Sequence, residues 1–94
     1  MVMVSHKEPV TLTIAGFDPS GGAGTIADIK TFVSFGCRPV AAITSLTFQN
    51  SEGVFGAIHE NGESLRAQIL LIVQEVRIAA IKTGMLPSRL YSGD

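Results

Sequence analysis

A glycine-rich segment, residues 16–24, has the composition of a loop that holds a ligand. It reads GFDPSGGAG and contains three glycines within four residues, Gly21, Gly22 and Gly24. Glycine lets the backbone adopt positive φ and lets a ligand come close to the main chain. A helix is expected to begin near Ala23, and its first N–H groups would be free and partly positive. The segment therefore predicts a site for an anion or a polar small molecule, although a plain turn between a strand and a helix also uses glycine.

Four further residues have side chains that suit recognition of a small aromatic ligand. Gln49 offers one acceptor and two donors, which match the amino group and ring nitrogen of a heteroaromatic ring. Asp28, just inside the expected helix, could accept a hydrogen bond from a ligand hydroxyl. Phe17 and Met85 could pack against a ring. Three of them also have an ordinary structural interpretation: Gln49 as a solvated loop residue, Asp28 as a favourable charge near a helix N-terminus, and Met85 as a core residue.

Three other reactive residue types have no assigned catalytic role. We expect Cys37 to be a small apolar residue after a helix end, His59 to lie at the surface, and Lys82 to pair with a carboxylate at a strand end. A single cysteine cannot form an intramolecular disulfide, and no Cys/His cluster has zinc-ligand spacing. The sequence therefore predicts no metal site and a cytoplasmic location.

Two nucleotide-binding motifs can be tested against the glycine-rich segment. Residues 22–27, GAGTIA, fit the dinucleotide pattern G-x-G-x-x-A. However, they follow the expected strand by several residues, and the next strand ends in Thr47-Phe48-Gln49 where a ribose-binding acid would be required. A Walker A loop needs Lys followed by Ser or Thr after its last glycine, and Thr25 and Ile26 stand there instead. Dinucleotide binding thus stays as a minor alternative, and the Walker A interpretation fails.

The 94-residue chain is apolar and carries little charge, with 46% hydrophobic and 16% charged residues and a mean hydropathy of +0.37. An ordinary soluble domain has about 25% charged residues, so much of this surface is expected to be covered. The net charge is −1, and neither sign forms a run. Without a run of basic residues, the sequence predicts no nucleic-acid partner. It also predicts no membrane partner, because no apolar run approaches the roughly 20 residues of a membrane span.

The elements that would position the candidate residues alternate between strand and helix. Strands are expected at residues 12–15, 40–48 and 78–83, and residues 54–58 indicate a short additional strand. The strands expected at residues 40–48 and 78–83 are apolar at nearly every position, which is typical of a parallel sheet buried on both faces. The order β-α-β-(β)-α-β predicts an α/β fold with a mostly parallel sheet. Because ligands bind beyond the carboxyl ends of such strands, residues 16–24, 49–53 and 84–85 are expected to converge.

Two helices are expected to join these strands. The first should end at Gly36, and the second should follow an N-cap at Asn61, with Glu63 where the helix dipole favours negative charge. Apolar residues recur at helical spacing in both. The first stripe is Ile26, Ile29 and Val33, and the second is Leu65, Ile69, Ile72, Val73 and Val76.

Two crossovers that wind in one direction would place both helices on the same face of the sheet. The opposite face would then be bare, although its strands are apolar on both sides. We therefore expect a flexible arm at residues 1–9 and a partial domain at residues 10–94 that is incomplete at its carboxyl end. More chain, or another subunit of a homo-oligomer, would cover the bare face.

Three segments together resemble the amino-terminal part of the hydroxymethylpyrimidine/phosphomethylpyrimidine kinases of thiamine biosynthesis, in the ribokinase-like superfamily. They are TLTIAGFDPSGGAGTIADIKTF, AAITSLTFQN and AAIKTGML, and they occur in the family's order between Thr11 and Leu86. The resemblance implies a three-layer α/β sandwich of which this chain is the β-α-β-(β)-α-β part. It also implies ATP and Mg²⁺ as cosubstrates, with phosphorylation of 4-amino-5-hydroxymethyl-2-methylpyrimidine and then of its monophosphate. Some relatives also phosphorylate pyridoxine-type vitamers.

The same resemblance implies roles for four residues of this chain. Gly16 and Asp28 would line the pyrimidine pocket, Gln49 would read the aminopyrimidine edge, and Met85 would lie beside the ring. The family's anion hole, of G-T-G-C type with a catalytic cysteine, belongs to the carboxyl-terminal half. We therefore expect no catalytic, cofactor-binding or metal-binding residue in this chain.

The chain departs from the family pattern at Phe17, where Ser or Thr is usual, and at Ile26, which is often Gln. These departures indicate a less polar pocket or one shaped for a different ring. The expected function is the pyrimidine-binding part of a kinase, inactive alone. The alternative is a non-catalytic pyrimidine- or pyridoxine-binding module that completes its fold by oligomerising.

Overall fold

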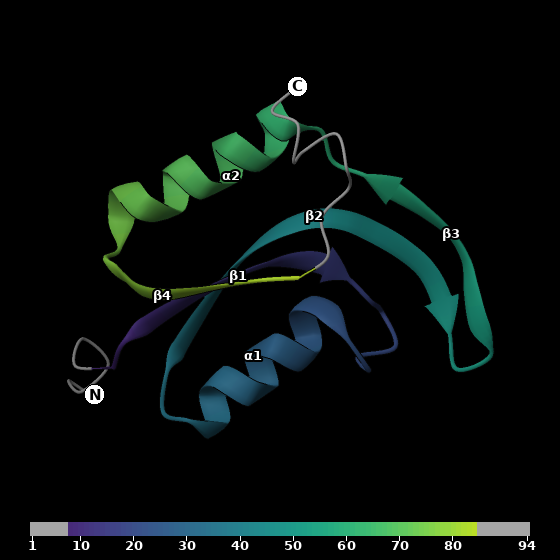
Figure 1. The fold of residues 1–94 in the computed structure, drawn as a ribbon, viewed down its shortest axis with the longest axis horizontal. Helices are drawn as coiled ribbons and strands as arrows, with labels where there is room; N and C mark the ends of the chain where they lie inside the picture. Colours follow the sequence, from purple (N-terminus) through teal and green to yellow (C-terminus); the bar gives the residue numbers. More distant parts are fainter. Residues whose placement is uncertain (1–7, 85–94) are drawn as a thin grey trace.

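The computed structural model describes residues 8–84, in which a four-stranded sheet lies between two helices (Figure 1). Along the chain the elements alternate as the apolar patterns predict. The elements are β1 (Val10–Phe17), α1 (Gly24–Ser34), β2 (Arg38–Asn50), β3 (Gly53–His59), α2 (Gly62–Glu75) and β4 (Ile78–Thr83).

The sheet has the order β3-β2-β1-β4. Strand β1 pairs in parallel with β2 and with β4, whereas β3 pairs antiparallel with β2. The α/β class and the mostly parallel sheet are therefore confirmed. Because β1 has a strand on each side and a helix over each face, Leu12, Thr13 and Ala15 are almost completely buried. This central strand is the core of the described part.

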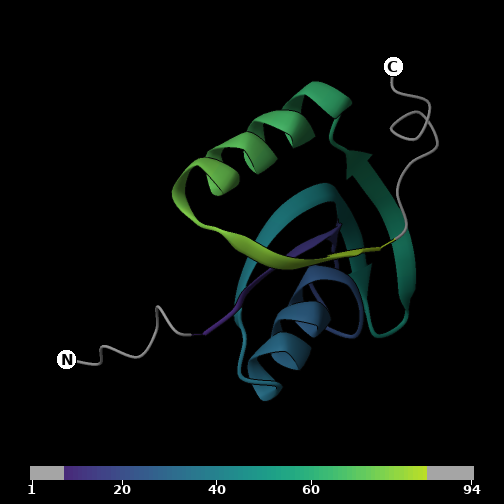
Figure 2. The same cartoon turned by 60° about the vertical axis from the view of Figure 1, so that its left-hand side comes forward.

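The two helices lie on opposite faces of the sheet, as two views show (Figure 1, Figure 2). The prediction that both cover one face and leave the other bare is wrong. The first crossover carries the chain from β1 to β2, but the second carries it back past β1 to β4 on the far side. Right-handed crossovers that run in opposite directions place their helices on opposite faces. The described residues thus form three layers by themselves.

The ends of the helices follow the local signals in the sequence. The Asn61 side chain accepts a hydrogen bond from the Ser64 N–H at 2.7 Å, so the predicted N-cap of α2 is confirmed. At the end of α1, Gly36 adopts a φ of +79°, which suits the predicted helix stop. Val73, expected in the apolar stripe of α2, is instead 47% exposed. No helix within residues 8–84 is long and apolar enough to cross a membrane.

Strand β2 is longer than expected and forms a ribbon with β3. Phe17, the last residue of β1, pairs with Leu46, and beyond that point β2 continues to Asn50 beside β3 (Figure 1). Gln49, expected in the turn that ends the strand, therefore lies within it. Polar side chains favour a turn, but the antiparallel partner supplies backbone hydrogen bonds that outweigh this preference.

Before Ser45, the edge of β2 that faces β3 is hydrogen-bonded to a side chain of α2 and not to a strand of the part that the structure describes. Strand β3 first pairs with β2 at Ser45, and Glu60 donates its N–H to the Thr44 carbonyl. At Ile43 the backbone N–H donates to Gln68 Oε1 at 2.8 Å, while Gln68 Nε2 donates to the Ile43 carbonyl at 2.9 Å. One side chain of α2 thus replaces a missing strand residue and fixes α2 against the sheet.

Candidate functional site

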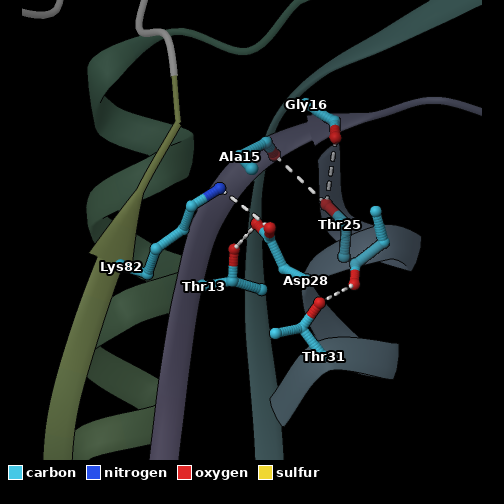
Figure 3. Close-up of polar contacts among 8 residues, drawn as sticks. Thr13, Ala15, Gly16, Thr25, Asp28, Thr31 and Lys82 are labelled. Carbon is cyan, nitrogen blue, oxygen red and sulfur yellow. Dashed lines mark hydrogen bonds and ion pairs between the residues drawn. The ribbon is translucent and has the colours of Figure 1, made fainter. Parts of the chain in front are cut away.

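The carboxyl end of β1 is joined to the start of α1 by close backbone contact. Gly24 has a φ of +65°, and a Cβ atom there would lie 2.2 Å from the Gly16 carbonyl oxygen. Thr25 donates its hydroxyl to the same oxygen at 3.1 Å (Figure 3). Only glycine permits so close an approach of two backbone segments. The glycine-rich segment is therefore needed to bring the first turn of α1 against β1.

Asp18 organises the loop between β1 and α1. One carboxylate oxygen accepts from the Ser20 N–H at 2.8 Å and from the Ser20 hydroxyl at 2.6 Å, and the other accepts from the Ala23 N–H at 3.1 Å. The Ser20 hydroxyl in particular lowers the pKa of Asp18 from its ordinary value. The carboxylate thus satisfies loop donors, so it is engaged in shaping the loop.

Asp28 lies one turn further into α1 and faces the sheet (Figure 3). Its Oδ2 accepts from the Thr13 hydroxyl at 2.6 Å, and its Oδ1 lies 2.8 Å from Lys82 Nζ. Burial of the carboxylate opposes ionisation, but the Lys82 ammonium and the Thr13 hydroxyl outweigh it and lower the pKa of Asp28. The expectation that Lys82 pairs with a carboxylate is confirmed.

The contacts of Asp28 tie three elements together: β1 through Thr13, β4 through Lys82, and α1 itself. A carboxylate has about four lone-pair sites, so the two protein donors leave acceptor capacity for a ligand hydroxyl. The side chain is 13% exposed, which limits that access to one side. A ligand-binding role for Asp28 stays a prediction beside this structural one.

Gln49 is connected to the end of β1 through Thr47. The Thr47 hydroxyl lies 3.0 Å from the Phe17 carbonyl oxygen and 2.7 Å from Gln49 Oε1. Because alternate residues of a strand share a face, Thr47 and Gln49 point the same way from β2. Sequence reasoning missed Thr47, since a threonine within an apolar strand is an ordinary strand former; its position two residues before Gln49 was the available signal.

Residues after β4 reach the same edge of the sheet. The Gly84 N–H donates to the Ile14 carbonyl at 2.8 Å, and a Cβ atom on Gly84 would lie 3.2 Å from the Ala15 Cβ. A Cβ atom on Gly16 would lie 2.8 Å from Ser45 Oγ of β2. The ends of β1 and β4 therefore lie close to the middle of β2. Residues 49–53, which were expected to converge with them, lie instead in the ribbon formed by β2 and β3. Met85 lies outside the described residues.

The donor set of this edge does not fit a divalent cation. Within residues 8–84 no group of three or more His, Cys, Asp or Glu side chains could hold a metal ion. Asp18 accepts from its own loop, and Asp28 is paired with a lysine. Each carboxylate thus already has protein donors, and within residues 8–84 neither belongs to a group of three potential metal ligands.

The chain is similar to known proteins in sequence and in fold. Residues 18–91 match the family model described as phosphomethylpyrimidine kinase. The hydroxymethylpyrimidine/phosphomethylpyrimidine kinase of Streptomyces coelicolor is 45% identical over 80 residues, which are 85% of this chain and 30% of that protein. The corresponding enzyme of Bacillus subtilis is 49% identical over 75 residues, covering 80% of this chain and 28% of that protein.

A solved structure has the same fold. The crystal structure of phosphomethylpyrimidine kinase from Clostridium difficile superposes with a TM-score of 0.83 and 39% identity, covering 88% of this chain and 36% of that one. The ribokinase-like α/β fold expected from the sequence is confirmed by this likeness. The chain spans about a third of the length of the relatives that it matches.

Proposed function

Because the chain belongs to the phosphomethylpyrimidine kinase family, we propose that it is the pyrimidine-binding part of a hydroxymethylpyrimidine/phosphomethylpyrimidine kinase. The whole enzyme would phosphorylate 4-amino-5-hydroxymethyl-2-methylpyrimidine and its monophosphate in the cytoplasm, with ATP and Mg²⁺ as cosubstrates. The observation that supports this most is the contact of Thr47 with both the Phe17 carbonyl and the Gln49 amide. That contact brings a group able to read an aminopyrimidine to the edge where α/β sheets bind ligands.

Each of the four site residues has one role in this proposal. The backbone at Gly16 borders the ring, and the Gln49 amide hydrogen-bonds to its amino group and ring nitrogen. Asp28 accepts from the hydroxymethyl group with its remaining lone pairs, and Met85 packs beside the ring. Glycine at position 16 also suits the packing of β1 against β2, because a Cβ atom there would lie 2.8 Å from Ser45 Oγ.

Binding without turnover is expected of this chain alone. Phosphoryl transfer depends on donors and cations arranged around the transferred group, and the carboxylates Asp18 and Asp28 are engaged by protein donors instead. The chain therefore orients the pyrimidine, and the anion hole that the family resemblance implies would come from sequence beyond this part.

Isothermal titration of the 94-residue chain with 4-amino-5-hydroxymethyl-2-methylpyrimidine tests the proposal. We expect one-to-one binding that Gln49→Leu weakens roughly tenfold, the discrimination typical of a bidentate amide contact. Gln74→Leu, the same change at an exposed position of α2, should leave the affinity unchanged. Incubation with ATP and Mg²⁺ should release no ADP. Equal affinity of the Gln49→Leu variant, or sustained phosphorylation, would contradict the proposal.

A non-catalytic binding module that oligomerises is the second candidate. It is favoured by large apolar side chains that remain exposed in the described part, such as Phe35 at 79% and Phe55 at 72%. Its ligand would be a pyrimidine or a pyridoxine-type ring; a pyridoxal kinase of Staphylococcus aureus, solved with AMP-PCP and pyridoxal, is 27% identical with a TM-score of 0.75. Light scattering after size-exclusion chromatography decides: a tight stoichiometric homo-oligomer supports this candidate, and a monomer or soft aggregate contradicts it.

A further inference from the structure

We propose that Thr47 is a specificity-determining positioning residue, which fixes the orientation of the Gln49 amide and so selects a ligand with an amino donor beside a ring acceptor. This inference rests on the proposed function of the site. It concerns which of two opposite hydrogen-bonding patterns the Gln49 amide presents, since the oxygen and nitrogen of an amide exchange places when the group turns by 180°.

The geometry favours the orientation in which Gln49 Oε1 faces Thr47. The Thr47 hydroxyl has one proton and two oxygens within reach, Gln49 Oε1 at 2.7 Å and the Phe17 carbonyl at 3.0 Å. Hydrogen bonds between two oxygens are most often about 2.7–2.8 Å long, whereas those from nitrogen to oxygen are most often about 2.9–3.0 Å. The single proton therefore has two alternative acceptors, and the 2.7 Å contact with Gln49 Oε1 has the ordinary length of a hydrogen bond from a hydroxyl to an amide oxygen.

The hydroxyl itself is held in place by its surroundings. Thr47 stands on β2 one residue beyond Leu46, which pairs with Phe17 at the end of β1. Its β-branched side chain has few rotamers in a strand. Thr47 and Gln49 are both half-buried, whereas Phe48 between them is exposed on the other face. The rigid residue of the pair is thus Thr47, and the longer Gln49 side chain adapts to it.

The fixed amide presents an acceptor and a donor side by side to a ligand. Its oxygen keeps one lone pair on the side of the amide nitrogen, and the nitrogen keeps its N–H groups. An aminopyrimidine matches this edge, because its amino group donates and the adjacent ring nitrogen accepts. The 4-oxo counterpart has the reverse pattern, an accepting oxygen beside a donating ring N–H. Only a turned amide matches it, and turning breaks the contact with Thr47.

The test measures the affinity ratio for this pair of ligands. The 94-residue chain is titrated with 4-amino-5-hydroxymethyl-2-methylpyrimidine and with 5-hydroxymethyl-2-methylpyrimidin-4-one. We expect the unchanged chain to prefer the amino ligand by roughly tenfold or more. Thr47→Val keeps the shape of the side chain but removes the hydroxyl. It should lower the affinity ratio of the amino ligand to the 4-oxo ligand by roughly threefold to tenfold, the effect expected from the loss of one hydrogen bond. Thr47→Ser should restore it.

Two controls separate positioning from a structural effect. In a Gln49→Leu background, Thr47→Val should no longer change the ratio, because Thr47 acts through Gln49. Thr31→Val removes a hydroxyl that bonds only within α1, to the Ala27 carbonyl, and should also leave the ratio unchanged. Should Thr47→Val prove poorly folded by circular dichroism, the Thr47→Ser and Thr47→Ala variants give the same comparison.

The outcomes distinguish this inference from the proposed function. A preference that Thr47→Val narrows and Thr47→Ser restores supports it. A preference for the amino ligand that survives Thr47→Val overturns it and leaves the proposed function standing. Failure of the unchanged chain to bind either ligand overturns the proposed function of the site, and this inference with it.

Discussion

Lys82 Nζ lies 2.8 Å from Asp28 Oδ1, and this contact joins β4, one of the two edge strands of the described part, to helix α1. The two residues are 54 positions apart in the sequence. Asp28 also accepts from the Thr13 hydroxyl, whose side chain is fully buried in β1. The same carboxylate is therefore a cross-link within the fold and a candidate contact for a ligand.

The two donors to Asp28 should contribute unequally to stability. Lys82 is 49% exposed, and exposed ion pairs typically contribute about 0–1 kcal/mol. We expect Lys82→Met to lower the free energy of unfolding by less than about 1 kcal/mol. Thr13→Val removes a buried donor from a charged acceptor and should cost about 1–3 kcal/mol. Urea unfolding followed by circular dichroism measures both, with Lys30→Met at an exposed position of α1 as the control. A larger loss for Lys82→Met than for Thr13→Val would contradict this ranking.

Stability should depend on pH through Asp28. Its pKa is lowered in the folded chain from the ordinary 3.8, so the folded state favours the ionised form. The resulting stabilisation is fully present above the unfolded pKa and is lost as the pH falls through the folded pKa. Asp28→Asn should therefore be less stable than the unchanged chain near pH 7, and the difference should shrink below about pH 4. Urea midpoints between pH 7 and pH 3 measure this. A difference that grows as the pH falls would show the sign to be wrong.

Two glycines with similar backbone angles should respond differently to alanine. Gly24 and Gly36 have φ values of +65° and +79°, which cost an L-residue roughly 1–2 kcal/mol. At Gly36 nothing lies within 4 Å of an added Cβ, so Gly36→Ala should cost only that strain. At Gly24 the Cβ would lie 2.2 Å from the Gly16 carbonyl oxygen, so we expect a loss of roughly 3 kcal/mol or more. Thermal and urea unfolding compare the two variants. Equal losses would mean that the close approach of Gly24 to Gly16 is not tight in solution.

Local features of the fold could be predicted from sequence because neighbouring residues determine them. The Asn61 cap and the Gly36 helix stop depend on side-chain and backbone chemistry within one turn. The order of the strands depends on pairing between distant segments, and strands that are apolar on both faces fit any central position. The sequence pattern therefore does not indicate that β4 pairs with β1 on the side away from β2, and for this reason the prediction that both helices lie on one face is wrong.

The structure brings together two of the three segments expected to converge, those near Gly16 and Gly84, whereas residues 49–53 belong to the β2–β3 ribbon. The convergence of residues near Gly16 and Gly84 follows from parallel strands, whose carboxyl ends share one edge. The partners of Asp28 and Gln49 depend on strand register and on the length of β2, which polar residues after Phe48 had suggested was shorter. Lys82 was correctly expected to find a carboxylate, but only the register of β4 identifies that carboxylate as Asp28.

The contact between Gln68 and Ile43 should be essential for holding α2 against the sheet. Gln68 donates to the Ile43 carbonyl and accepts from its N–H, so it satisfies two backbone groups that have no strand partner on that side among residues 8–84. Gln68→Leu leaves both groups unpaired in a half-buried place, and we expect it to cost about 1–3 kcal/mol. Gln68→Glu keeps the acceptor but brings a carboxylate towards the Ile43 carbonyl, so it should recover no more than part of the loss at pH 7. Urea unfolding measures the cost, and amide hydrogen exchange at Ile43 should accelerate more in Gln68→Leu than in Gln68→Glu, which keeps an acceptor for the Ile43 N–H. The control is Gln74→Leu at an exposed position of the same helix; if its loss equalled that of Gln68→Leu, helix propensity rather than the backbone contact would be responsible.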